Sequence, residues 1–277
     1  MAGRQAVEYR GALHEVINVA DAGQVTDIAR RALAALDLTS LGEDDSPERI
    51  EALCAAADGP GGAPAAICVY PEHIVTARRA LAGRGLHQVR VATVVNFPDG
   101  GADAGRAARE SRRAVAAGAD EVDMVLPWQA LLSGDARAAR AVVAACRDAT
   151  AGRVLKVIIE SGSLGTVSRV SAASELALDA GADFIKTSTG KVATGATPQA
   201  ARVMLGAIQG RGGRAGFKVS GGVRTLADAA VYLGVADELL GRDWATPSHF
   251  RIGASALLGE IRTALGGEAG KPGAEGY

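Results

Sequence analysis

Cysteine is scarce in this chain of 277 residues, with three copies at Cys54, Cys68 and Cys146. The three lie far apart, form no CxxC pair and cannot make an even disulfide framework, so we interpret them as reduced thiols of a cytoplasmic protein. Histidine is also rare, with four copies at positions that show no metal-ligand spacing. We therefore predict no bound metal, and no motif implies a cofactor.

Long apolar runs and a strong net charge are absent as well. No run of about 18 apolar residues occurs, so we expect no membrane span, and the first residues carry charges such as Arg4 and Glu8 in place of a signal peptide's apolar core. A net charge of −1 gives no reason to expect nucleic acid or an anionic membrane as a partner, so any anion site must be local. With aromatic residues at 4%, we interpret Trp128 and Trp244 as packing residues rather than a base-stacking platform.

Lysine is the scarcer of the two strong cations, and its placement is informative. The chain has five lysines beside 25 arginines, at positions 156, 186, 191, 218 and 271. Lys156, Lys186 and Lys218 lie inside strand-like runs, and Lys191 closes a turn shortly after Lys186. A desolvated amine can lose its proton and attack a carbonyl, which a guanidinium cannot do. We therefore hypothesise that at least one of these lysines is a nucleophile.

Strand-like runs alternate with helix-like stretches along most of the chain. We predict strands at Leu36–Thr39, Ala65–Tyr70, Val89–Asn96, Glu121–Leu126, Val154–Glu160, Asp183–Thr187, Ala215–Ser220 and Phe250–Gly253, and helices at Ser46–Ala57, Pro71–Ala82, Asp103–Ala117, Gln129–Ala149, Val167–Asp179, Pro198–Gln209, Leu226–Leu233 and Ala254–Leu265. Eight such units of about 30 residues predict an α/β fold, a single-domain (β/α)8 TIM barrel. A doubly wound open sheet is the alternative, but no glycine-rich phosphate loop follows the first strand.

The barrel is expected to span residues 1–265 as one domain. Residues 1–33 have a helical pattern interrupted by Gly11 and Gly23, which predicts extra N-terminal helices. Residues 266–277 are rich in glycine and charge, which is typical of a flexible C-terminal tail.

Polar side chains gather where the predicted strands end, which is where barrel enzymes place their active sites. They are Asp37, Thr39, Asn96, Asp123, Lys156, Glu160, Lys186 and Lys218. Lys186 and Lys218 lie on neighbouring strands about 4.8 Å apart, so two inward-facing amines would crowd each other. Like charge and desolvation would lower one pKa, as in a Schiff-base lysine.

The residues alone leave open which lysine attacks. Asp123 supplies a carboxylate that can pass protons while a carbinolamine forms and collapses. The alternative is that Asp123, Lys186 and Lys218 form a salt-bridge network that only stabilises the barrel, although burying three charges is a poor way to gain stability.

Three glycine-rich segments follow the last three strands. They are Thr189-Gly190-Lys191, Gly221-Gly222-Val223-Arg224 and Gly253-Ala254-Ser255. We expect the last two to open helices, and backbone N–H groups at helix N-termini bind phosphate. With Lys191 and Arg224 close by, these segments predict a phosphate site, and hence a small phosphorylated carbonyl compound as substrate.

Ordered motifs from Asp37 to Leu265 carry a family resemblance. They include Leu36–Thr39, Ala66–Pro71, Asn96–Pro98, Gly118–Asp123, Lys156–Glu160, Gly181–Gly190, Gly221–Thr225 and Arg251–Ser255. In these motifs the chain resembles the deoxyribose-phosphate aldolases, a family of class I aldolases. The resemblance implies reversible cleavage of 2-deoxy-D-ribose 5-phosphate to D-glyceraldehyde 3-phosphate and acetaldehyde in deoxyribose catabolism. It also implies a homo-oligomer, a dimer or larger.

The same resemblance assigns roles to individual residues. Lys186 would be the Schiff-base nucleophile, Lys218 would lower its pKa and join the proton relay, and Asp123 would be the general acid/base. The implied substrate-binding residues are Asp37, Thr39, Lys156, Thr189, Gly190, Lys191, Gly221, Gly222, Arg224, Gly253 and Ser255. Another lysine-dependent sugar-phosphate aldolase, a transaldolase-like enzyme, or a catalytically silent sugar-phosphate-binding barrel are the alternatives.

Two positions depart from the family pattern. Val219 replaces the usual Ala or Pro after the strand-7 lysine, and we expect it to point away from the barrel axis. Ala256 replaces a frequent second Ser, which removes one possible phosphate hydroxyl. Tyr277 resembles a C-terminal tyrosine that reaches the active site in some members of the family.

Overall fold

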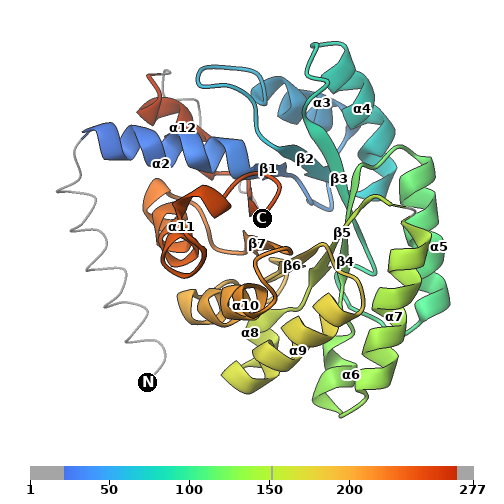
Figure 1. The fold of residues 1–277 in the computed structure, drawn as a ribbon. Helices are drawn as coiled ribbons and strands as arrows, with labels where there is room; N and C mark the ends of the chain where they lie inside the picture. The colour runs from blue at the N-terminus through green and yellow to red at the C-terminus, as the bar shows by residue number, and fades with distance from the viewer. Residues whose placement is uncertain (1–21, 151, 267–277) are drawn as a thin grey trace.

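Eight parallel strands close into a barrel in chain order, from β1 to β8 and back to β1 (Figure 1). The structure is a computed structural model that describes residues 22–150 and 152–266. The strands are β1 (Leu36–Thr39), β2 (Ala66–Val69), β3 (Arg90–Val95), β4 (Glu121–Val125), β5 (Val154–Ile158), β6 (Phe184–Lys186), β7 (Gly216–Ser220) and β8 (Phe250–Ala254). The predicted (β/α)8 barrel is confirmed, with each strand within two residues of its predicted ends.

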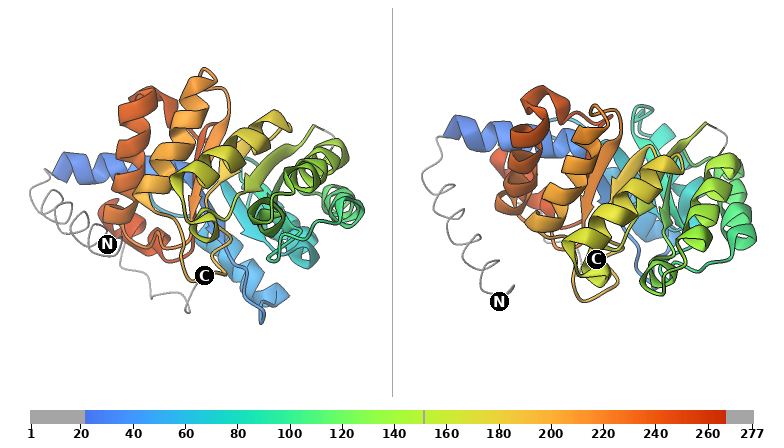
Figure 2. Two further views of the ribbon diagram at one scale, coloured as in Figure 1. Left: turned by 90° about the horizontal axis from the view of Figure 1, so that it is seen from below. Right: turned by 60° about the horizontal axis from the view of Figure 1, so that its bottom comes forward.

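Helices surround the barrel on its outside (Figure 2). They are α2 (Ala22–Ala35), α3 (Pro47–Ala56), α4 (Ile74–Ala82), α5 (Ala104–Ala116), α6 (Trp128–Leu132), α7 (Ala136–Ala149), α8 (Ser161–Leu164), α9 (Val167–Asp179), α10 (Pro198–Gly210), α11 (Leu226–Leu240) and α12 (Leu257–Ala264), with 3-10 turns η1 (Pro71–His73) and η2 (Arg242–Trp244). Helix α2 runs directly into β1 and packs against α11 and α12. No helix in the two described ranges is long and apolar enough to cross a membrane. The expected first helix before Gly23 and the tail after Gly266 lie outside the described residues.

Short polar residues begin several helices, as the sequence predicted for α3. The Ser46 hydroxyl accepts the Arg49 N–H, and Pro47 occupies the first helical position. Asp103 caps α5 and Thr197 caps α10 in the same way. The alternation of strand and helix is therefore encoded locally, at the points where each helix starts.

Some predicted helix boundaries are wrong, and local chemistry explains why. The stretch Gln129–Ala149 is two helices, because the chain turns at Gly134 with φ of 88° and Asp135 then caps α7. Likewise, α12 starts three residues later than predicted because β8 continues to Ala254. Helix α11 runs on to Leu240 instead of ending at Leu233, and the four-residue helix α8 was not predicted.

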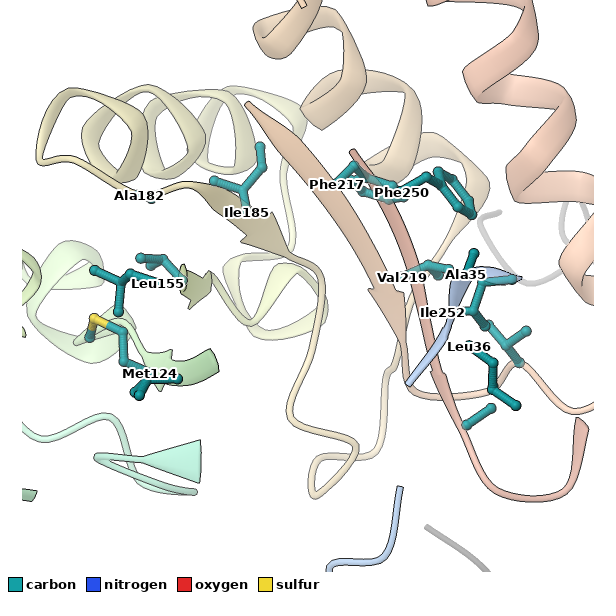
Figure 3. Packing of buried hydrophobic residues seen from close by; sticks show 14 of the residues in the cluster. Ala35, Leu36, Met124, Leu155, Ala182, Ile185, Phe217, Val219, Phe250 and Ile252 are labelled. Atoms are coloured by element: carbon teal, nitrogen blue, oxygen red, sulfur yellow. The ribbon is translucent and has the colours of Figure 1, made fainter. Parts of the chain in front are cut away.

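The main hydrophobic core lies between the strands and the helices (Figure 3). Phe217 and Val219 of β7 pack there with Phe250 and Ile252 of β8, and the two phenyl rings are 5.9 Å apart between centroids. Val219 therefore points away from the barrel axis, as expected. The residues between them, at alternate positions along each strand, face the inside of the barrel.

Inside the barrel, β2 and β3 contribute apolar side chains, whereas each of the other six strands contributes at least one charged side chain. Ala66 and Cys68 of β2 form a separate buried cluster with Ala92 and Val94 of β3. The short side chains on β2 and β3 leave room for the long lysine side chains that reach across from β5, β6 and β7.

The lower interior layer depends on a glycine. Phe184 of β6 is paired with Gly216 of β7, and a Cβ atom built on Gly216 would fall inside contact distance of the Phe184 ring. The ring is also covered by the guanidinium of Arg251, 5.7 Å from its centroid. Gly216 thus makes space for the ring on which Arg251 rests.

We expect Gly216→Ala to lower the free energy of unfolding by about 1–3 kcal/mol, because the added methyl overpacks a closed layer. Urea denaturation measures this change. Gly234→Ala in α11 is the matched control, since nothing lies within 4 Å of the Cβ position there. That control should stabilise by about 0.5–1 kcal/mol by removing a helix glycine, and equal effects of the two substitutions would contradict the packing argument.

Candidate active site

A single carboxylate, that of Asp123, gathers three lysines inside the barrel. Its Oδ2 accepts hydrogen bonds from Nζ of Lys186 at 3.0 Å and Nζ of Lys218 at 2.8 Å, and its Oδ1 accepts from Nζ of Lys156 at 2.7 Å. All four side chains are almost completely buried. The strand register brings these side chains together. Lys186 of β6 is paired directly with Lys218 of β7, and Asp123 of β4 is paired directly with Lys156 of β5.

Two further carboxylates and an arginine complete this group, which we call the charge cluster. Asp37 of β1 accepts from Lys218 at 2.5 Å through Oδ2 and from Arg251 at 2.7 Å through Oδ1. Glu121 of β4 pairs with Nζ of Lys156 at 2.6 Å and with both terminal nitrogens of Arg251 at 2.7 and 3.0 Å. The cluster therefore comprises Lys156, Lys186, Lys218, Arg251, Asp37, Glu121 and Asp123.

Lys186 is the lysine whose amine is most easily deprotonated. Burial lowers its pKa, and the neighbouring ammonium of Lys218 lowers it further, while Asp123 opposes the shift. Among the described residues, its ion pairs are limited to the one with Asp123. An uncharged amine at this position is a potential nucleophile.

The other two lysines keep their protons. Burial alone would lower the pKa of Lys218, but Asp123 and Asp37 outweigh it and raise that pKa well above its usual value. Burial is likewise outweighed at Lys156 by Asp123 and Glu121, so its pKa is raised. Burial would raise the pKa of Asp123, yet the three surrounding lysines hold it well below the usual range. The carboxylate is thus ionised, and Lys156 and Lys218 hold their protons more tightly than Lys186 does.

Sequence reasoning missed Glu121 and Arg251. The alternation of side chains along a strand could have found them. Glu121 lies two residues before Asp123, and Arg251 lies two residues before Gly253, so each lies on the inward face of its strand. Lys156 was grouped with substrate-binding residues, and the structure places it among carboxylates, fully buried. Cys68 also faces the cluster, and burial raises the pKa of its thiol.

The turn after β6 is held by Glu160, at the end of β5. Glu160 has left-handed backbone angles (φ 54°, ψ 57°), which a non-glycine residue adopts at a cost. Its carboxylate accepts the Thr189 hydroxyl at 2.6 Å and the Thr189 N–H at 3.2 Å. The Thr189 oxygen in turn accepts the Lys191 N–H, and the Lys191 ammonium reaches the Leu41 carbonyl at 2.7 Å. Thr189 is therefore bonded within the protein, and the turn it anchors presents Gly190 and Lys191.

Two of the three glycine-rich segments lie directly against each other. Gly190, Gly221 and Gly222 have φ of 79°, 84° and 96°, which glycine adopts without strain. A Cβ atom on Gly221 would be 3.6 Å from Cα of Gly190 and 3.4 Å from Cβ of Ser188. The loops after β6 and β7 thus meet just beyond Lys186.

The third glycine-rich segment, Gly253-Ala254-Ser255, was expected to open a helix, but α12 begins only at Leu257. Gly253 lies inside the barrel, where a Cβ atom would be 3.0 Å from Cε of Lys218. It makes room for that lysine rather than opening a helix. Ser255 follows β8 and is half-buried, and Ala256 is the N-cap of α12 without a side-chain hydrogen bond. The N–H groups that begin α12 are therefore not capped by that residue.

The second segment, Gly221-Gly222-Val223-Arg224, lies directly before a helix, as predicted. Helix α11 begins at Leu226, and its first N–H groups are already bonded. Thr225 and Asp228 form a capping box, and Asp228 also accepts the Arg224 N–H. Glu260 of α12 accepts the Leu226 N–H at 2.7 Å. The start of α11 is thus occupied by carboxylates, whereas the start of α12 has no side-chain cap.

Two buried hydroxyls near the strand ends, those of Ser161 and Ser188, have no hydrogen-bond partner within the described chain. The side-chain oxygen Oδ1 of Asn96 shares this property. Ser188 lies two residues after Lys186, so it follows the same face of β6. Thr39 differs, because its hydroxyl donates to the Asp37 carbonyl at 2.7 Å. Buried polar atoms without partners are costly, and a bound polar ligand or water satisfies them.

Comparison with known families agrees with this arrangement. Residues 31–257, which contain all eight strands, match the family described as DeoC/LacD family aldolase. This chain belongs to that family. As a DeoC/LacD family aldolase it is related to lyases that form or cleave carbon–carbon bonds at a carbonyl compound.

Solved structures similar to this DeoC/LacD aldolase share the barrel. A protein from Coccidioides immitis, provisionally named deoxyribose-phosphate aldolase, is 30% identical with a TM-score of 0.73, over 84% of this chain and 87% of that one. An aldolase named QR15 is 28% identical with a TM-score of 0.70, over 85% and 96% of the two chains. A Toxoplasma gondii protein with the same provisional name is 24% identical with a TM-score of 0.81, over 88% and 97% of the chains, and supports the fold alone.

Asp123→Asn should lower the free energy of unfolding of this DeoC/LacD aldolase by about 3–5 kcal/mol at neutral pH, because buried ammonium groups lose their shared carboxylate. The folded-state pKa of Asp123 lies below its unfolded value of about 3.9. Its contribution is therefore complete above that pH and is lost as the pH falls below it. Urea denaturation from pH 7 to pH 3 should show the wild-type and variant curves converging.

The matched control is Asp148→Asn, at an exposed carboxylate on α7. It should change the free energy of unfolding by less than about 0.5 kcal/mol at every pH. A gap between wild type and Asp123→Asn that stayed constant down to pH 3 would mean that Asp123 does not stabilise the cluster through its charge.

Proposed function

We propose that this chain is a deoxyribose-phosphate aldolase that reversibly cleaves 2-deoxy-D-ribose 5-phosphate to D-glyceraldehyde 3-phosphate and acetaldehyde. The observation that carries the proposal is the amine of Lys186, buried with a lowered pKa beside the protonated Lys218 and the carboxylate of Asp123. Membership of the aldolase family supports the reaction type, and the 30% identity to the Coccidioides protein supports the substrate.

In the first step the neutral amine of Lys186 attacks the C1 carbonyl carbon of the open-chain sugar. The carbonyl oxygen takes a proton and becomes the hydroxyl of a carbinolamine, and the amine nitrogen gives up a proton. The Lys218 ammonium donates the proton to the carbonyl oxygen. The carboxylate of Asp123, 2.8 Å from Lys218 and 3.0 Å from Lys186, accepts the proton that the Lys186 nitrogen releases and passes it to the Lys218 amine, which restores the ammonium. Loss of water then leaves a protonated Schiff base on Lys186.

The Schiff base draws electrons from the bond to be broken. A base removes the proton from the C3 hydroxyl, the C2–C3 bond breaks, and its electron pair moves to form an enamine on Lys186. D-glyceraldehyde 3-phosphate leaves with C3 as its aldehyde carbon. Protonation of the enamine at C2 and hydrolysis release acetaldehyde. We assign the proton transfers to Asp123 acting with Lys218, and the contacts to sugar hydroxyls to Asp37 and Thr39.

The phosphate end of the substrate is assigned to the loops beyond β6, β7 and β8. Gly190, Gly221 and Gly222 offer backbone N–H groups in turns without side chains, and Lys191 and Arg224 supply positive charge. Ser255 and the start of α12 supply the remaining donors. This position matches the usual phosphate site of the (β/α)8 architecture.

A homo-oligomer, a dimer or larger, is part of the same proposal. An aldolase from Aeropyrum pernix described as a tetramer shares the fold at 23% identity, with a TM-score of 0.66. The second candidate function is another lysine-dependent sugar-phosphate aldolase or a transaldolase-like enzyme. Comparing turnover of 2-deoxyribose 5-phosphate with that of fructose phosphates and keto-acid phosphates separates the two candidates.

Acetaldehyde and sodium borohydride should trap a two-carbon adduct on Lys186, because borohydride reduces the Schiff base to a stable secondary amine. Peptide mapping by mass spectrometry identifies the modified lysine. Lys186→Met should abolish both the adduct and turnover of deoxyribose 5-phosphate, whereas Lys191→Met should retain the adduct. An adduct on Lys218 or Lys156 in the wild type would overturn the assignment, and ligand binding without turnover would indicate a silent barrel.

Arg224→Ala should raise the KM for deoxyribose 5-phosphate by about 10–100-fold, the loss expected for about 1.5–3 kcal/mol of a charged hydrogen bond. Because the change affects only the phosphate, kcat/KM for non-phosphorylated deoxyribose should stay the same. Steady-state kinetics with the two substrates measures this difference. Arg90→Ala, at the exposed start of β3 and so at the opposite end of the barrel, is the matched control. Equal losses on both substrates would place Arg224 outside the phosphate site.

A further inference from the structure

The charge cluster contains one more cation than it has carboxylates. Its four basic groups are Lys156, Lys186, Lys218 and Arg251, and its three acidic groups are Asp37, Glu121 and Asp123. An excess charge in a buried site is expensive, and loss of one proton removes it. Arginine keeps its proton in proteins, so the proton must come from a lysine.

The contacts decide which lysine gives up its proton. Lys156 has Glu121 at 2.6 Å and Asp123 at 2.7 Å, and Lys218 has Asp37 at 2.5 Å and Asp123 at 2.8 Å. Lys186 has Asp123 alone within ion-pair distance among the described residues, at 3.0 Å, and it shares that oxygen with Lys218. Lys186 is therefore the ammonium with the least compensation.

Arg251 creates this shortage, although it does not touch Lys186. Its terminal nitrogens bond to both oxygens of Glu121 and to Oδ1 of Asp37. It is 6% exposed and rests on the Phe184 ring, so it is a fixed part of the barrel interior. Arg251 is permanently charged, and it pairs with two carboxylates that also pair with lysines. The negative charge left for the three lysines is therefore too small to keep all of them protonated.

We propose that Arg251 and Glu121 act as a positioning pair that sets the number of protons held by the three lysines, so that Lys186 is the uncharged one. The inference rests on the proposed role of Lys186 as nucleophile. It assigns function to two residues on the far side of Asp123 from the reacting atoms. Their effect on Lys186 is electrostatic and depends on the balance of charge, not on the identity of either side chain.

Other charged or titratable groups face Lys186 as well. They are Cys68 of β2, Asp123 of β4, Glu160 two residues beyond β5, and Lys218 of β7, which in turn contacts Asp37 of β1. The cysteine is neutral, because burial raises its pKa. The Glu160 carboxylate bonds to Thr189, and burial raises its pKa. Neither group forms an ion pair with a member of the charge cluster among the residues described, so the count of four against three refers to the groups joined by ion pairs. Glu160 is unchanged in every variant of the test below, so its influence on Lys186 is common to all of them.

The test changes the charge of the cluster by single and double substitutions and measures how the reactivity of Lys186 depends on pH. The rate of acetaldehyde adduct formation on Lys186 is followed by borohydride trapping and peptide mass spectrometry from pH 5 to pH 10, and its midpoint is compared with that of the wild type. Arg251→Met removes a cation and leaves three against three, so the midpoint should move up by about one to three pH units. Glu121→Gln removes an anion and leaves four against two, so the midpoint should move down.

The double variant Arg251→Met/Glu121→Gln has three lysines against two carboxylates, the same excess as the wild type. Its midpoint should return to within about half a pH unit of the wild-type value, since equal and opposite changes of charge cancel. Arg251→Lys keeps a cation at the position and is the matched control, with the midpoint unchanged. Circular dichroism establishes that each variant is folded, and if Arg251→Met does not fold, the isosteric Glu121→Gln and the double variant decide.

Midpoints that move in the same direction in both single variants, that do not move, or that stay displaced in the double variant would overturn the inference. A merely structural role predicts slower labelling at every pH with the same midpoint. Failure of the proposed function would look different, because the wild type itself would then show no adduct on Lys186 at any pH.

Discussion

One buried carboxylate, Asp123, determines how the interior of this barrel is arranged. Three amines from three consecutive strands converge on its two oxygens, at 2.7 to 3.0 Å. Buried charge is tolerated only when it is compensated and hydrogen-bonded. Asp37, Glu121 and Arg251 meet that requirement. Asp37 pairs with Lys218, Glu121 pairs with Lys156, and Arg251 pairs with both of these carboxylates. The arrangement leaves Lys186 the least compensated of the three lysines.

The surrounding architecture makes such a cluster possible. The main apolar core lies outside the sheet, between strands and helices, and supplies the stability that a charged interior cannot. Inside, Ala66, Cys68 and Ala92 keep one wall thin, while Gly216 and Gly253 open the space for Phe184 and Lys218. The interior is thus shaped by small residues as much as by charged ones. The alternative reading of the cluster as a purely stabilising network fits this design poorly, because the stability already comes from elsewhere.

Much of the fold could be predicted from sequence because its signals are local. Strand periods, glycines and caps such as Ser46 act within a few residues, so all eight strands and most of the helices between them were predicted in the right order. Lys186 and Lys218 could be placed side by side because consecutive strands of a parallel barrel are neighbours. Glu121 and Arg251 could not be paired, because β4 and β8 lie on opposite sides of the barrel and no local pattern encodes their contact. The start of α11 at Leu226 was predicted, but the occupation of its first N–H groups was not, because Glu260, which accepts the Leu226 N–H, comes from another helix.

The closure of β8 onto β1 has a consequence for how the chain folds during synthesis. Asp37 is among the first strand residues to be made, yet its two partners, Lys218 and Arg251, are added 181 and 214 residues later. Until the ribosome has released β8, the amines and carboxylates of the earlier strands have no closed interior and remain hydrated. The contacts of Asp37 with Lys218 and Arg251, and with them the complete charge cluster around Lys186, can therefore form only once the barrel is closed.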